Sequence, residues 1–329
     1  MTPRKPKGKI AFITTPQFRK SRPKEIESFV YKNMYSLCLY FDVMTTGRTY
    51  DFLTRLLKKS TYKTLQGTKY LKLISSDTKQ PNIQSEKELV NWRETILSGL
   101  KPVESSYQGM IHITYELVEG RLDAVIHLTD WQDKSAKPDS AVLSREANVH
   151  NVPFATNVET AEAMVAQWKS VIDAGRRVFR KRKEPDAPPL NGIKEKHRVL
   201  AMVAHDNMKL EICRFAVQHA AYVFRNYDFI LATVTTGAWI KAFMEAMGRA
   251  PSDINKIRCC NPGPLGGDLQ IAYAVVKGLC HKIIFLQDPS VSHPHDSDIR
   301  LFEQATVTKG VNVKLATNID TATLLILSE

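Results

Sequence analysis

Segments from the first half of the chain recur in its second half, in the same order. Three pairs carry the pattern: KIAFITT (9–15) with VLAMVAH (199–205) at an offset of 190 residues, DAVIHLTD (123–130) with HKIIFLQD (281–288) at 158, and VPFATNVETAE (152–162) with VKLATNIDTAT (313–323) at 161. Self-similarity of this kind is the mark of a duplicated structural unit. The sequence therefore predicts two domains of one topology.

The offsets also locate the interruptions. Thr45-Thr46-Gly47 pairs with Thr235-Thr236-Gly237 at 190, so the later fall to 158 indicates about 32 additional residues in the first copy. We expect this insertion within 56–105, which is polar and rich in lysine. A basic run with several Pro and Gly residues, unsuited to helix or central strand, marks the boundary between the copies. The predicted organisation is a degenerate copy (1–174), a linker (175–197) and a second copy (198–329).

Within the second copy, short apolar runs alternate with longer segments of helical period. The predicted strands are 198–204, 228–233, 256–260, 282–286 and 312–315, and the predicted helices are 208–224, 237–247, 268–277, 298–309 and 321–327. Such alternation predicts an α/β fold with a parallel sheet and helices on both faces. Ligands on these sheets bind at the carboxyl ends of the strands.

Composition narrows the class of protein. With 43% hydrophobic and 24% charged residues, the chain is typical of globular protein, and no apolar stretch suits a membrane helix or a secretory signal. Five cysteines without a CxxC pair favour neither disulfides nor a thiolate zinc site, so we expect a cytoplasmic protein.

The net charge of +12 is uneven. Residues 1–174 carry 25 Lys/Arg against 19 Asp/Glu, residues 175–198 carry 9 against 3, and residues 199–329 carry 12 against 12. A basic face would suit nucleic acid, but a solvated linker gives the same count, and we favour the linker. No partner nucleic acid or membrane is expected.

Polar residues follow every predicted strand of the second copy, and we expect them at one edge of the sheet. They are His205-Asp206 with Lys209, Thr233 to Gly237, Gly263 to Asp268, Asp288-Pro289 and His293 to Asp298. Each alone is ordinary in caps and turns. Together they supply a phosphate-ester site: hydroxyls and amides at a helix start beside a lysine hold an anion, and histidines with carboxylates transfer protons.

Over about residues 198–329 the chain resembles methylglyoxal synthase. The resemblance rests on the motifs VAHD-(x)2-K, TTG, GPLGGD, DP and PHDxD, in this order and followed by ATN. The resemblance implies two tandem three-layer αβα Rossmann-like domains with parallel sheets. It also implies a carbon–oxygen lyase that converts dihydroxyacetone phosphate into methylglyoxal and inorganic phosphate, with phosphate as product or inhibitor. No metal or organic cofactor is implied.

The resemblance also implies roles for individual residues. Asp268 is the expected base, His205 and His295 are expected to donate to the enediolate oxygens, and Asp298 and Asp288 are expected to support them. The expected phosphate cradle consists of Lys209, Thr233, Thr235, Thr236 and the N–H of Gly263. Family members form hexamers, so we expect a homo-oligomer, a trimer or hexamer; a mass measurement giving a stable monomer would exclude it.

Two departures leave alternatives open. Pro262 and Val234 stand where the family usually has Ser and Gly, and Pro262 removes a hydroxyl and an N–H donor, which predicts altered phosphate recognition. The first copy has Thr15-Pro16 and Arg19 in place of His205-Asp206 and Lys209, and no GGD precedes its helix 108–118. It is either an anion-binding or a purely structural copy. The whole protein could instead be a non-catalytic phosphate- or effector-binding regulator.

Overall fold

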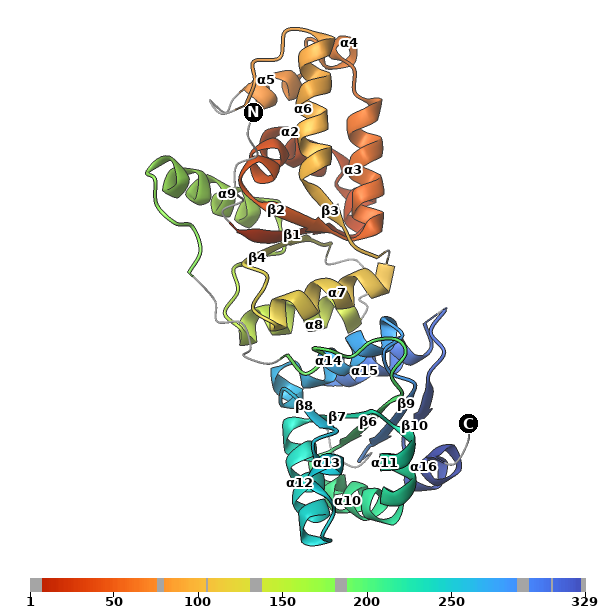
Figure 1. The fold of residues 1–329 in the computed structure, drawn as a ribbon. Coiled ribbons are helices and arrows are strands. Elements are labelled where there is room, and N and C mark those ends of the chain that lie inside the picture. The colour runs from red at the N-terminus through yellow and green to blue at the C-terminus, as the bar shows by residue number, and fades with distance from the viewer. Residues whose placement is uncertain are drawn as a thin grey trace. The chain divides into compact units, whose positions relative to one another are not determined.

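The computed structural model describes residues 8–75, 80–104, 106–130, 138–180, 188–288, 296–308 and 310–326. The chain forms two compact units, an N-terminal unit of residues 1–137 and 143–184 and a C-terminal unit of residues 138–142 and 185–329. Each unit is built on one five-stranded sheet (Figure 1). No helix in the described ranges has the length and apolar character needed to cross a membrane.

The N-terminal sheet has the strand order β3-β2-β1-β4-β5, and every pairing is parallel. Its strands are β1 (Lys9–Thr14), β2 (Asp42–Thr45), β3 (Leu100–Pro102), β4 (Ala124–Leu128) and β5 (Phe154–Ala155). The helices before residue 180 are α1 (Pro16–Ser21), α2 (Pro23–Tyr40), α3 (Gly47–Lys59), α4 (Tyr62–Leu65), α5 (Lys69–Ser75), α6 (Glu86–Gly99), α7 (Ser106–Val118), α8 (Pro138–Val149) and α9 (Val158–Asp173).

The C-terminal sheet has the strand order β10-β9-β6-β7-β8, again with parallel pairings. Its strands are β6 (Val199–Ala204), β7 (Phe229–Thr233), β8 (Ile257–Cys260), β9 (Lys282–Leu286) and β10 (Lys314–Ala316). Its helices are η1 (Asp206–Met208), α10 (Lys209–Gln218), α11 (Ala220–Asn226), α12 (Val234–Ala246), α13 (Pro251–Ile254), η2 (Gly263–Leu265), α14 (Gly267–Val276), α15 (Asp296–Thr306) and α16 (Ile319–Ile326).

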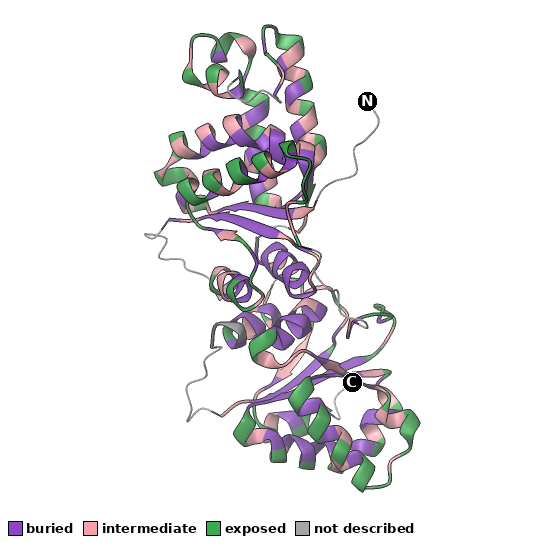
Figure 2. Cartoon of the chain, turned by 90° about the vertical axis from the view of Figure 1, so that its left-hand side faces the viewer, coloured by how far each residue is buried: buried purple, intermediate pink, exposed green. Residues whose placement is uncertain are grey.

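The prediction of an α/β fold with parallel sheets is therefore confirmed. Read from its other end, the C-terminal order becomes β8-β7-β6-β9-β10, which is the N-terminal order element for element. In the N-terminal unit α2, α3, α6 and α9 pack on one face of the sheet and α7 and α8 on the other. Buried strands flanked by helices with exposed outer faces are visible in both units (Figure 2).

Strand register corrects the pairing of the two TTG motifs. Lys9 pairs with Asp42, and its counterpart Val199 pairs with Phe229, so β2 matches β7 at an offset of 187 rather than 190. Thr46 therefore corresponds to Thr233, and both are the N-cap residues of the following helices. The sequence prediction was wrong because it aligned the identical TTG motifs. The helical connection from β1 to β2 is three residues longer than the one from β6 to β7, and this shifts the true match by three residues.

Several other boundaries in the C-terminal unit differ from the prediction by one to three residues, and two helices show the differences that matter most. The helix expected over 208–224 is broken at His219, whose φ of −101° and ψ of 9° end α10 and precede α11. The helix expected from Gly237 begins at Val234. The second change matters because it brings the start of α12 directly to the end of β7.

The described part of the segment 56–105, where the insertion was expected, contains helices. Between α3 and β3 the chain forms α4, α5 and α6, whereas only α13 lies between α12 and β8. Leu89, Trp92 and Ile96 of α6 are buried in the core on one face of the sheet. The Trp92 indole N–H donates to Gln80 Oε1 at 3.0 Å, which satisfies the buried donor.

Glu116 on α7 gives the N-terminal unit a measurable acid sensitivity. Burial raises its pKa, but hydrogen bonds from Arg121 (2.8 Å) and Lys9 (2.6 Å) outweigh burial and lower the pKa below its ordinary value. A carboxylate whose pKa is lowered in the folded state stabilises the fold at pH values above its unfolded-state pKa. This stabilisation is lost as the pH falls through the folded-state pKa. We expect Glu116→Gln to reduce the free energy of unfolding at pH 7 by about 1.5–3 kcal/mol, as for a hydrogen bond to a charged group.

Urea unfolding at pH 7 and at pH 3.5 measures this effect. The difference between native protein and Glu116→Gln should shrink at the lower pH, because protonation removes the same interaction. Glu162→Gln is the control, since the side chains of its ion pair with Lys32 are 33% and 40% exposed and such a solvent-screened pair is worth little. Equal pH dependence in native protein and Glu116→Gln would contradict the assignment.

Candidate active site

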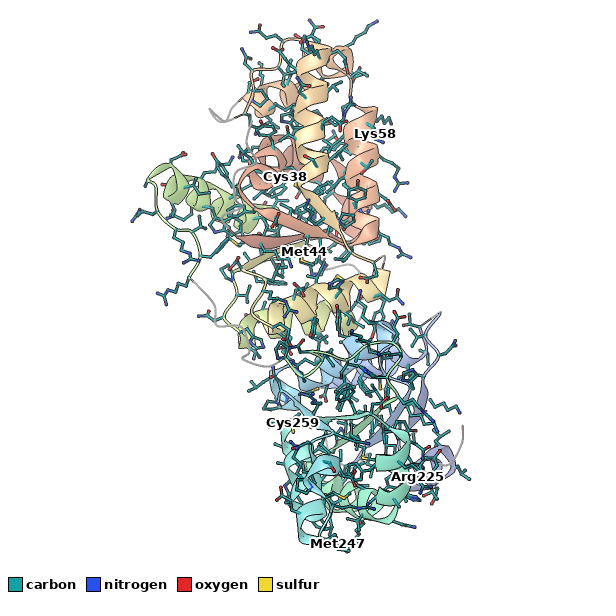
Figure 3. All side chains as sticks on the ribbon, in the orientation of Figure 1. Cys38, Met44, Lys58, Arg225, Met247 and Cys259 are labelled. Carbon is teal, nitrogen blue, oxygen red and sulfur yellow. The ribbon has the colours of Figure 1, made fainter. Side chains whose placement is uncertain are left out.

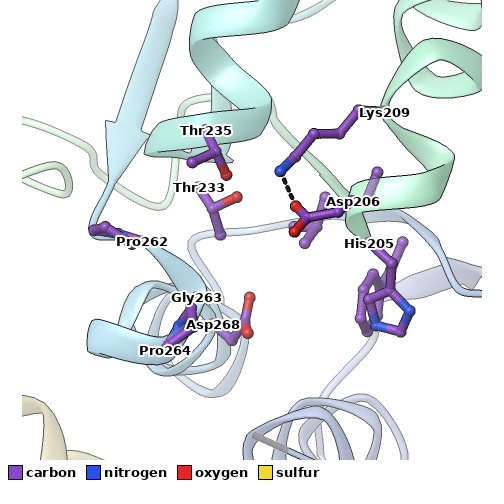
Figure 4. A pocket seen from close by; sticks show the side chains of 12 residues that line it. His205, Asp206, Lys209, Thr233, Thr235, Pro262, Gly263, Pro264 and Asp268 are labelled. Carbon is purple, nitrogen blue, oxygen red and sulfur yellow. Dashed lines mark hydrogen bonds and ion pairs between the residues drawn. The ribbon is translucent and has the colours of Figure 1, made fainter. Parts of the chain in front are cut away.

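A pocket of about 280 Å³ lies at the carboxyl edge of the C-terminal sheet. Side chains from the ends of β6 and β7 and from the turn after β8 converge on it (Figure 4). Six of the residues expected from the sequence line it, together with residues that were not expected. The lining residues are Val203, Ala204, His205, Asp206, Lys209, Thr233, Thr235, Pro262, Gly263, Pro264, Asp268 and Phe285.

Two glycines set the position of Asp268. Gly266 adopts φ 92°, a left-handed conformation that favours glycine, and turns the chain into α14. A Cβ on Gly267 would lie 1.9 Å from the main-chain oxygen of Asn261, so only glycine fits beside that carbonyl. Asp268 then follows as the second residue of α14, 5% exposed, where the helix dipole favours negative charge. A carboxylate held this way suits a general base.

His205 comes directly after β6, and its ring is held by the main chain just after the end of β9. The Asp288 N–H donates to His205 Nδ1 at 2.9 Å, and the ring meets Phe285 edge to face at 5.1 Å between centroids. Since Nδ1 accepts a hydrogen bond, the proton of the neutral ring lies on Nε2. This arrangement makes Nε2 a hydrogen-bond donor.

Asp288 contributes through its backbone rather than by lining the pocket. Its carboxylate accepts a hydrogen bond from Asn207 Nδ2 at 2.8 Å, which ties the chain after β9 to the chain after β6. The same residue's N–H holds His205. The sequence predicted a supporting role for Asp288 but gave no sign of Asn207 as its partner.

The start of α12 forms one wall of the pocket. Thr233 is the N-cap residue and makes no side-chain cap bond; its hydroxyl donates instead to Thr236 Oγ1 at 3.1 Å. Thr236 is fully buried beneath it and does not line the pocket. This wall therefore offers the Thr235 and Thr233 hydroxyls and the first-turn amides of α12, a set of groups that favours an anion because such amides have no partners within the helix.

Lys209 reaches the same wall and is ion-paired with Asp206 (Figure 4). The lysine side chain is 11% exposed and the aspartate side chain 90% exposed, so solvent screens the carboxylate far more than the ammonium. A phosphate dianion inside the pocket can therefore replace Asp206 as the partner of Lys209. Asp206 was not among the predicted site residues, although its spacing of three from Lys209 is that of a helical ion pair.

Pro262 has a structural role that the sequence comparison did not predict. Its carbonyl accepts hydrogen bonds from the N–H groups of Leu265 (2.9 Å) and Gly267 (3.0 Å). The residue thus shapes the turn that presents Gly263 to the pocket and starts α14. Proline at this position removes one N–H donor, but the turn that its carbonyl stabilises is intact.

Two predicted residues cannot be placed in the pocket. His295 lies outside the described residues, and Asp298 belongs to α15 although its side chain is outside the described part. Among the side chains that are described, no three His, Cys, Asp or Glu residues gather as metal ligands would.

The N-terminal unit has no carboxylate at the position of Asp268 and no histidine at the position of His205. Gly109 matches Gly267. A Cβ on Gly109 would lie 2.0 Å from the main-chain oxygen of Glu104, just as a Cβ on Gly267 would meet the main-chain oxygen of Asn261. Met110 therefore takes the place of Asp268. The position of His205 is occupied by Thr15, which caps α1 through Phe18 N–H. The retained glycine is visible in the sequence only after alignment at the offset of 158.

Comparisons with known proteins find relatives of one part of this chain. No family model matches the chain. A methylglyoxal synthase from Thermus thermophilus is 40% identical over 129 residues, 39% of this chain and 92% of the relative, and one from Ralstonia nicotianae is 34% identical over 134 residues, 40% and 89%. A solved methylglyoxal synthase from Elizabethkingia anophelis shares 29% identity over 41% of this chain and 80% of its own, with a TM-score of 0.34. The chain belongs to the methylglyoxal synthase family.

Proposed function

We propose that the C-terminal unit converts dihydroxyacetone phosphate into methylglyoxal and inorganic phosphate. The observation that supports this most is the convergence of Asp268, His205 and the Lys209–Thr235 cradle on one pocket. The relatives named methylglyoxal synthase match a span of 129 residues, about the length of one unit. We propose a cytoplasmic location for the enzyme.

The pocket's chemistry follows from three tasks. Asp268 removes a proton from the hydroxymethyl carbon next to the substrate carbonyl, and the Nε2–H of His205 donates to the enediolate oxygen that forms. The proton of the former hydroxymethyl O–H passes to the neighbouring oxygen that came from the carbonyl. The resulting oxyanion on the terminal carbon becomes an aldehyde, and its electron pair expels phosphate as the carbon–oxygen bond to the phosphate group breaks. The remaining enol, 2-hydroxypropenal, takes a proton on its methylene carbon and becomes methylglyoxal. Lys209 and the start of α12 hold the phosphate throughout.

Incubation of the full-length protein with dihydroxyacetone phosphate tests the proposal. Methylglyoxal and phosphate should appear in equal amounts. Formation of glyceraldehyde 3-phosphate without phosphate release would show an isomerase, and binding without turnover would favour the effector-binding function. Pro262 is the observation that favours this second function, since it removes one amide donor from the wall of the pocket.

Lys209→Gln should act mainly on substrate affinity. Loss of the charged partner removes a hydrogen bond to phosphate worth about 1.5–3 kcal/mol, which corresponds to a KM about 10- to 100-fold higher. We expect a smaller change in kcat, because phosphate is held similarly before and during the reaction. Lys241→Gln on α12 removes the same charge outside the lining of the pocket and is the matched control. Unchanged KM in Lys209→Gln would exclude this role.

A further inference from the structure

The N-terminal unit keeps the architecture of the phosphate cradle with different side chains. The corrected register matches Thr46 to Thr233 and Arg48 to Thr235, and the offset of β1 and β6 matches Arg19 to Lys209. In the N-terminal unit, Arg19 thus takes the place of Lys209 and Arg48 takes the place of Thr235. Arg guanidinium groups suit bidentate binding of phosphate better than an ammonium does.

Three arginines gather beside the start of α3. Arg48, Phe52 and Arg55 are spaced by four and three residues and share one face of the helix. The guanidinium of Arg19 lies 5.1 Å from the centre of the Phe52 ring. It is fixed there by hydrogen bonds from Nη1 to Arg48 O (2.9 Å) and from Nε to Thr15 O (3.3 Å).

No carboxylate in the described part of the chain forms an ion pair with these arginines. On the same helix, Arg55 Nε donates to the main-chain oxygen of Asp51 at 3.3 Å. Burial lowers the pKa of Arg19, and the nearby Arg55 and Arg48 lower it further. Like charges held together in this way are stabilised by a bound anion.

Buried hydroxyls lie at the same edge. Thr14 and Thr45 end β1 and β2, are 3% and 0% exposed, and their Oγ1 atoms have no hydrogen-bond partner among the described residues. The first amide of α3 is already used, since Gly47 N–H donates to Glu104 O at 3.2 Å. The Glu104 carboxylate itself is paired with His112 at 2.8 Å.

We propose that Arg19, Arg48 and Arg55 with the start of α3 form a second, non-catalytic binding site for a phosphate group. The ligand is inorganic phosphate or a small phosphate monoester. No turnover follows binding, because Met110 and Thr15 stand where the C-terminal unit has its carboxylate and histidine. The site is independent of the function proposed for the C-terminal unit.

Titration calorimetry of the full chain with inorganic phosphate at low ionic strength tests this site. Lys209→Gln serves as the background, because it weakens the C-terminal cradle. We expect Lys209→Gln to retain one phosphate site, and the further change Arg48→Gln to weaken that site at least tenfold. Arg48 is exposed, so the variant should fold; circular dichroism checks this.

The matched control is Lys58→Gln in the same background. Lys58 belongs to the same helix but lies at its end away from the sheet (Figure 3). Unchanged binding in this control supports the site, whereas equal weakening by Lys58→Gln and Arg48→Gln would show only general charge attraction and overturn it. Absence of any phosphate site in Lys209→Gln would also overturn it. Repeating the titration with glycerol 3-phosphate distinguishes a free anion from a monoester as the preferred ligand.

Discussion

Asp268→Asn should lower kcat for dihydroxyacetone phosphate by about 10²- to 10⁴-fold, the range that a positioned base contributes. The amide keeps the size and most hydrogen bonds of the carboxylate but cannot accept the substrate proton. Because Asp268 is 5% exposed at the start of α14, solvent hydroxide has little access to replace it. The loss should appear in kcat, since the phosphate cradle is untouched.

Methylglyoxal release from native protein and Asp268→Asn, measured in parallel, gives the result. Asp253→Asn on α13 is the matched control, because its carboxylate pairs with Arg249 at 3.5 Å and does not line the pocket. Phosphate binding by Asp268→Asn should persist and shows that the pocket is intact. Activity retained in this variant would mean that another group removes the proton.

The parallel sheets could be predicted because buried strands are short, continuous apolar runs. VLAMVA of β6 and IIFL of β9 are such runs, and both are buried along their whole length. Their shared carboxyl edge follows from parallel pairing alone, which is why residues as distant in sequence as His205 and Asp268 could be expected in one site. The residue-by-residue match between β2 and β7 could not be predicted from the sequence, because strand register depends on pairing with the neighbouring strand rather than on local sequence similarity.

Other parts of the site depend on contacts between distant segments that no local pattern encodes. The state of His205 is set by the main-chain N–H of Asp288, and a main-chain donor has no sequence signature. Phe285 beneath the ring looks like any residue of a buried strand. The sequence alone indicates only Arg19 and a basic surplus, because the offset of 190 places Arg48 opposite Ala238 rather than Thr235.

Gly267→Ala should damage activity and stability together. The added Cβ would meet the Asn261 carbonyl at 1.9 Å, so the start of α14 must move. Overpacking of this kind costs about 1–3 kcal/mol in stability. A shift of about 1 Å in Asp268 is enough to reduce kcat/KM by about 10²-fold, because proton transfer depends on geometry.

Gly109→Ala provides the matched comparison, since its Cβ would meet the Glu104 carbonyl at 2.0 Å in the N-terminal unit. The free energy of unfolding should fall by a similar amount, but the residue after Gly109 is Met110 and carries no proton-transfer role. We therefore expect turnover close to the native value at a temperature where circular dichroism shows folded protein. An equal loss of activity in both variants would mean that stability, not the position of Asp268, limits turnover. Full activity in folded Gly267→Ala would show that the contact with Asn261 does not position the base.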